Sequence, residues 1–200
     1  VLVVLQHAMG NPRTGGRTTF SRQDVRKQAR ELLERGDSLV GQRVRDGLRL
    51  LMVLKQLDSI DERQIAVVGV GRSAPVALAL GAIDGDVAAA AVGEVPQEDE
   101  DFELSVIPAS SMYFSGLDLA ALIVPRPILV SASGFPDVSY LDRLYDANAM
   151  DVVPDVVDDG DPNAFLRDAC QWARGLFRER SSGGETPTSQ PFAEQSSESL

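Results

Sequence analysis

The sequence predicts an α/β fold built on a mostly parallel sheet. Its 200 residues are 44% hydrophobic and 24% charged, the composition of one globular domain with a sizeable core. Short continuous apolar runs alternate with amphipathic stretches along the chain. A continuous run is typical of a strand covered on both faces, and such strands form parallel sheets. The alternation of strand and helix therefore favours the α/β class, with helices on both faces of the sheet.

Five apolar runs are candidate strands. They are residues 1–5, 65–69, 87–92, 128–132 and 152–157. The last run is the weakest, because Pro154 cannot donate a hydrogen bond to a neighbouring strand. We therefore expect it at the edge of the sheet.

Five amphipathic or apolar stretches are candidate helices. They are residues 22–35, 42–57, 75–80, 138–149 and 163–178. In the last one, apolar residues recur at positions 165, 169, 172, 173 and 176, which predicts a regular face toward the core. Residues 181–200 contain almost nothing that could be buried, so their composition predicts a disordered tail behind a domain of residues 1–180.

Charge and residue counts exclude several classes of function. The net charge of −11 makes binding to nucleic acid or to a membrane surface improbable. Cys170 is the only cysteine and His7 the only histidine, which excludes an internal disulfide, a cysteine-based zinc site and a multi-histidine metal site. The acidic cluster of residues 158–161 lacks the spacing of a known calcium loop. We expect no metal and no cofactor.

The segment from Ile65 to Pro75 predicts a strand, a sharp turn and a helix. This is the context of a nucleophile elbow, whose pattern is G-x-S-x-G. Small residues stand at its first and last positions, Gly69 and Ser73. The middle position, which carries the nucleophile in an elbow, is Gly71. The pattern therefore predicts that the turn is kept and that the nucleophile is absent.

Four stretches, in this order, resemble α/β hydrolases of the acetyl xylan esterase and cephalosporin-C deacetylase type, which are related to dienelactone hydrolases. The stretches are GDSLVGQRVRD (36–46), DERQIAVVG (61–69), DLAALIVPRPILV (118–130) and VDDGDPNAF (157–165). The resemblance covers about residues 1–178 and implies an α/β-hydrolase fold. It also implies that the chain starts after the first sheet strands and the oxyanion loop of the family, so we expect an amino-terminally truncated fold.

The family hydrolyses esters with a serine, a histidine and an aspartate. The resemblance places the acid at Asp137, the nucleophile at Gly71 and the histidine at Asp161. Two of the three side chains are thus substituted. The resemblance implies a degenerate member of the family without catalytic activity, whose ligand would be a small ester or a carbohydrate ester.

Two other functions remain open. A working carboxylic-ester or acetyl-ester hydrolase would need an unusual arrangement of His7, Ser73 and Asp137, and a protein-interaction module would use the acidic surface and the tail. His7, Arg72 and Ser73 are candidate ligand contacts, because they fall at the carboxyl edge of the predicted sheet. For Ser73 a packing or helix-capping role is favoured. No signal peptide is visible, so we expect a cytoplasmic protein, with self-association or a protein partner as further expectations.

Overall fold

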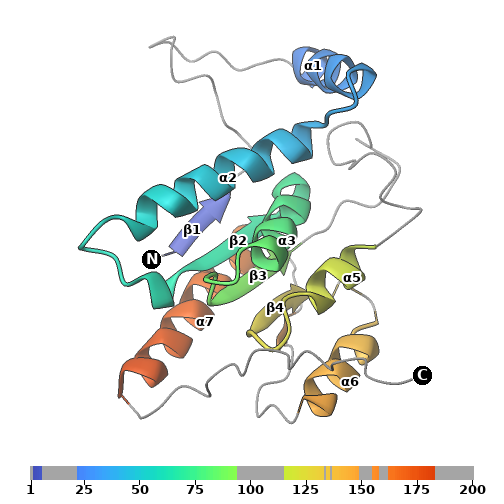
Figure 1. Ribbon diagram of the computed structural model, residues 1–200. Coiled ribbons are helices and arrows are strands. Elements are labelled where there is room, and N and C mark those ends of the chain that lie inside the picture. The colour runs from blue at the N-terminus through green and yellow to red at the C-terminus, as the bar shows by residue number, and fades with distance from the viewer. Residues whose placement is uncertain are drawn as a thin grey trace, which may run out of the picture.

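In the computed structural model, five parallel strands form one sheet, in the order in which they occur in the chain (Figure 1). The strands are β1 (Leu2–Leu5), β2 (Ala66–Val70), β3 (Ala89–Gly93), β4 (Ile128–Ser131) and β5 (Asp155–Val157). Every neighbouring pair is parallel, as the sequence predicts, and β5 lies at an edge. The structure describes residues 2–5, 22–93, 115–132, 134–135, 137–148, 155–157 and 162–182.

Six α-helices accompany the sheet in the described residues. They are α1 (Arg22–Glu34), α2 (Leu39–Lys55), α3 (Ala74–Ile83), α5 (Gly116–Ala121), α6 (Ser139–Ala147) and α7 (Pro162–Ser182). Helix α2 begins three residues earlier than the sequence predicts, because the Ser38 hydroxyl accepts a hydrogen bond of 2.9 Å from the Gly41 N–H and caps the helix. Helix α5 was not expected, since its six residues are too few to show a helical period.

The helices cover both faces of the sheet, because alternate residues of a strand point to opposite sides. Val67 of β2 belongs to the large core cluster shared with α2, α3, α5 and α6. Its neighbour Val68 packs instead with Phe165 of α7, and Ala66 packs with Ala173 of the same helix. Figure 1 shows the two layers, with α2 and α3 on one side of the sheet and α7 along the other.

The stretch Val124–Pro125–Arg126–Pro127, which entered the family resemblance, has a structural role. The Arg126 guanidinium donates hydrogen bonds of 2.9 Å to the carbonyl oxygens of Asp84 and Val87, in the loop that leads into β3. Tyr145 of α6 donates its hydroxyl hydrogen to the Arg126 carbonyl oxygen. These bonds fix the entry of β4 beside the entry of β3.

Candidate functional site

The chain turns sharply where β2 ends, at the carboxyl edge of the sheet. Gly71 has a φ of +58°, in the left-handed region that side chains rarely adopt, and it opens a single 3₁₀ turn, Gly71–Ser73, before α3 begins. A Cβ atom at Gly71 would meet nothing within 4 Å. The apex of the turn therefore faces open space, as the position of a nucleophile in an elbow requires.

The close approach of α3 to β2 explains the glycine at the first position of the pattern. A Cβ atom at Gly69 would lie 2.5 Å from the carbonyl oxygen of Ser73 and 2.7 Å from the Cβ of Ala77. No side chain fits between strand and helix at this point. The turn therefore brings strand and helix close together and carries no side chain at its apex, Gly71.

Ser73 stands at the last position of the pattern, and its hydroxyl is engaged by the turn itself. The side chain is buried, with 4% of the residue exposed. Its Oγ accepts a hydrogen bond of 3.0 Å from the Val70 N–H and donates one of 2.8 Å to the Val70 carbonyl oxygen. These two bonds close the turn and favour a packing role for Ser73; it is the N-cap residue of α3 but makes no side-chain capping bond to that helix.

Asp137 follows β4, so it also lies at the carboxyl edge of the sheet. The carboxylate is exposed and accepts a hydrogen bond of 2.9 Å from the Ser139 N–H, at the start of α6. Hydrogen bonds from Ser139, first from its side chain and then from its backbone, lower the pKa of Asp137, and the charge of Arg143 adds to this. In the described structure, this carboxylate accepts a hydrogen bond from the first residue of α6.

The remaining residues of the predicted triad and its neighbourhood are not all described. Asp161, His7, the acidic cluster of residues 158–161 and the tail beyond Ser182 lie outside the described residues. Within the described residues, no group of three or more His, Cys, Asp or Glu side chains could hold a metal ion. None of the described helices combines the length and the apolar character that crossing a membrane requires.

A pair of arginines beside the elbow includes one that the sequence did not single out. Arg72 directly follows the apex, and Arg43 lies in the second turn of α2. Burial lowers the pKa of the Arg43 guanidinium, and the nearby charge of Arg72 lowers it further. The two residues bring positive charge to the elbow of an acidic protein. Only Arg72 could be noticed from its place in the elbow, because Arg43 is distant in sequence.

No protein-family model and no curated protein matches the chain. Solved structures do. A protein assigned as an acetyl xylan esterase from Bacteroides fragilis superposes with a TM-score of 0.64 at 18% identity, over 80% of this chain and 53% of its own. A CE15 glucuronoyl esterase from Teredinibacter turnerae gives 0.56 at 14% identity, over 70% of this chain and 47% of its own. A methylesterase superposes with a TM-score of 0.55 at 20% identity, over 68% of this chain and 35% of its own.

These similarities, together with the parallel sheet and its two helical layers, show an α/β-hydrolase-like fold, as the sequence predicts. The chain spans about half the length of the acetyl xylan esterase and of the glucuronoyl esterase, and about a third of the methylesterase. All three similar structures are esterases by name.

Proposed function

We propose that this chain is a degenerate relative of ester hydrolases that binds an ester-bearing ligand without hydrolysing it. The observation that carries the proposal is Gly71, which keeps the left-handed backbone of an elbow apex and open space above it but has no side chain. Ester hydrolysis on this fold requires a nucleophile at that point, activated by a neighbouring base. Glycine can supply neither the attack on the carbonyl carbon nor a covalent intermediate.

The features left at the elbow are suited to binding. The turn leads directly into the N-terminus of α3, where the helix dipole favours oxygen atoms with negative charge, whereas the Ala74 N–H bonds to the Gly71 carbonyl oxygen and Pro75 has no N–H. Arg43 and Arg72 add positive charge beside the turn. An ester carbonyl or a carboxylate would meet this positive charge there, and no nucleophile at the apex.

The ligand class follows from the sequence resemblance and from the similar structures. These proteins are named for acetyl xylan, glucuronoyl and methyl esters. For this chain we infer a carbohydrate that carries an ester group, held at the carboxyl edge of the sheet. The inference extends to the binding class alone, since the chain covers only part of each similar structure.

Turnover and binding should be measured separately. We expect no hydrolysis of p-nitrophenyl acetate above a heat-killed control and no labelling by a fluorophosphonate, which reacts only with an activated serine. We expect acetylated xylo-oligosaccharides to bind in titration calorimetry, and the same oligosaccharides after deacetylation to bind more weakly.

The opposite result would identify a working enzyme. Turnover that is lost in both Ser73→Ala and Asp137→Asn would overturn the proposal in favour of a hydrolase with an unusual catalytic arrangement. Turnover that survives both substitutions would place the chemistry at other residues and would equally overturn it.

A further inference from the structure

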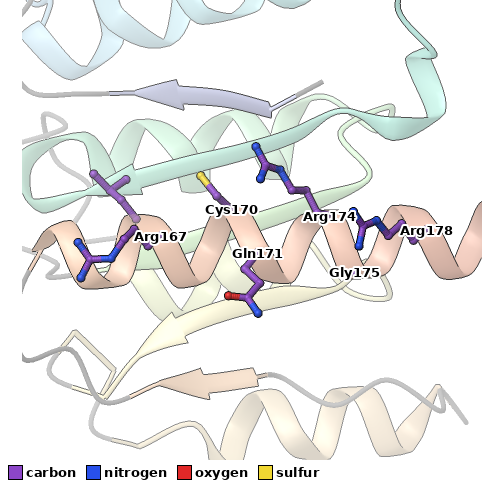
Figure 2. A pocket seen from close by; sticks show the side chains of 7 residues that line it. Arg167, Cys170, Gln171, Arg174, Gly175 and Arg178 are labelled. Carbon is purple, nitrogen blue, oxygen red and sulfur yellow. The ribbon is translucent and has the colours of Figure 1, made fainter.

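Three arginines form a stripe along the outer side of α7. Arg167, Arg174 and Arg178 follow one another at i, i+7 and i+11, so they lie on one line along the helix. The opposite side of α7 carries Phe165 and Ala169, which pack against the sheet. Figure 2 shows the arginines around an open surface hollow, lined by Leu166, Arg167, Cys170, Gln171, Arg174, Gly175 and Arg178. We call Arg167, Arg174 and Arg178 the arginine stripe.

The arginine stripe is a local exception on a protein with a net charge of −11. The ion pairs between described residues do not include Arg167 or Arg174. Arg178 already has an interaction of its own, so Arg167 and Arg174 are the charges of the stripe that a ligand would pair with. A negatively charged segment laid along this side of the helix would supply that pairing.

The chain itself provides such a segment directly after α7. Residues 183–200 contain Glu185, Glu194 and Glu198 and no lysine or arginine. The distance along the helix from Ser182 back to Arg167 is about 22 Å, which about seven extended residues can span. Because the segment is tethered to the end of the same helix, its effective concentration at the stripe is high. Electrostatic attraction can hold this segment at the stripe without the burial of apolar side chains.

We propose that residues 183–200 dock on the arginine stripe through their glutamates and cover the outer side of α7. Ion pairs at an exposed surface are individually weak, so the contact is partial, reversible and sensitive to salt. The contact is separate from the elbow and does not depend on the ligand proposed for that site.

Cys170 makes the contact measurable. It is the only cysteine of the chain, it is half-buried, and it lines the hollow beside Arg174. The rate of its reaction with a thiol reagent such as DTNB should be compared between the full chain and a chain ending at Ser182. At 20 mM NaCl we expect the shortened chain to react about two- to fivefold faster, as for an equilibrium worth a few weak ion pairs. At 500 mM NaCl the two rates should become equal.

Matched variants separate charge from bulk. The triple change Glu185→Gln, Glu194→Gln and Glu198→Gln keeps the length of the segment and should react as fast as the shortened chain. Arg174→Gln should abolish the difference between full and shortened chains. Arg180→Gln, on the same helix but outside the hollow, should preserve it; using the ratio of the two chains removes any direct effect of a substitution on the thiol.

Equal rates for the full and shortened chains at 20 mM NaCl would overturn the proposal. Protection that persists in 500 mM NaCl and in the glutamine triple variant would also overturn it, because the cover would then not be electrostatic. Slowing of the shortened chain by added poly-glutamate, but not by a neutral peptide of equal length, would support the stripe as the acidic binding surface.

Discussion

At the scale of single residues, two glycines of one turn are required for different physical reasons. Gly69 is fixed by space, since a Cβ atom there would collide with the backbone of Ser73. Gly71 is fixed by backbone conformation alone, since its φ is positive while the space around it is empty. A substitution at either position therefore tests a different property of the elbow.

Gly69→Ala should destabilise the protein by about 3 kcal/mol, because α3 and β2 must move apart. Gly71→Ala should cost only about 1 kcal/mol, the price of a left-handed residue with a side chain. Urea unfolding at pH 7 measures both. A larger loss for Gly71→Ala than for Gly69→Ala would contradict this account of the turn.

Gly71→Ser should add a hydroxyl at the apex with the same small loss of stability. The single variant should show little hydrolysis, because a serine without a base is a weak nucleophile. The double variant with Asp161→His should exceed the single variant in p-nitrophenyl acetate turnover if residue 161 occupies the position of the catalytic histidine. Asp159→His in place of Asp161→His is the matched control, and equal rates in both double variants would disprove the assignment of residue 161.

Arg43→Gln should stabilise the protein at low salt, because it removes a charge that is partly desolvated and is repelled by Arg72. The gain should shrink in 500 mM NaCl because salt screens the repulsion from Arg72. Arg49→Gln is the control, since Arg49 is exposed and pairs with Asp46 at 3.0 Å. A loss of stability in Arg43→Gln at both salt concentrations would show that Arg43 has a stabilising partner.

At the scale of elements, α5 shows why hydrophobic periodicity was insufficient to predict every helix. Its six residues are held by a reciprocal cap, in which the Ser115 N–H donates to the Asp118 carboxylate at 2.7 Å and the Asp118 N–H donates to the Ser115 hydroxyl at 3.3 Å. A helix this short has little stability of its own. The helix forms because of the cap and of its packing against the core. Neither feature can be read from a hydrophobic period in the sequence.

Ser115→Ala should cost about 1 kcal/mol at pH 7, the usual loss for a helix cap. Hydrogen bonds from Ser115, first from its backbone and then from its side chain, lower the pKa of Asp118. A carboxyl group whose pKa is lowered by folding stabilises the folded protein at pH values above its ordinary pKa. This stabilisation is lost as the pH falls through the pKa of the folded protein. The cost of Ser115→Ala should therefore shrink below about pH 4. Urea unfolding at pH 7 and pH 3 checks this, and an equal cost at both would show that the hydrogen bond from the Ser115 hydroxyl to the Asp118 carboxylate adds no stability.

The longer elements were predictable because tertiary packing and sequence pattern agree. The apolar stripe of α7 predicted the face that meets the sheet, and Pro154 predicted that the strand at residues 152–157 lies at an edge. The glycine pattern of the elbow predicted a sharp turn because it encodes backbone geometry. The proximity of Arg43 to Arg72 could not be predicted, since it depends on how α2 packs beside the turn that precedes α3.

At the scale of the whole molecule, a few ion pairs join segments that are distant in the chain. The ammonium group of Lys55, at the end of α2, lies 2.8 Å from Asp84 and 2.6 Å from Asp86, before β3. Burial alone would lower the pKa of Lys55, but the hydrogen bonds that Lys55 donates to the two carboxylates outweigh it and raise the pKa. This contribution to stability is complete at neutral pH and is lost as the pH rises through the raised value.

Lys55→Gln should destabilise the protein by about 1–2 kcal/mol, because its three hydrogen bonds to two carboxylates are lost. Lys27→Gln should change stability by less than about 0.5 kcal/mol, since Lys27 and Glu31 are exposed and 4.0 Å apart. Thermal unfolding at pH 7 compares them. Equal losses of stability in the two variants would show that the ion pairs between Lys55 and the loop before β3 stabilise the protein no more than an exposed ion pair does.

Helix α7 packs alone against one face of the sheet in the described residues, and it is also the last described element to be made by the ribosome. Until residue 182 has left the exit tunnel, Val68, Ala91 and Leu129 have no partner on that side. The growing chain thus carries an exposed apolar sheet face until α7 is made, a surface of the kind that chaperones bind and that associates with other chains. A stop codon placed before α7 should yield an aggregating product, whereas one placed just after Ser182 should not.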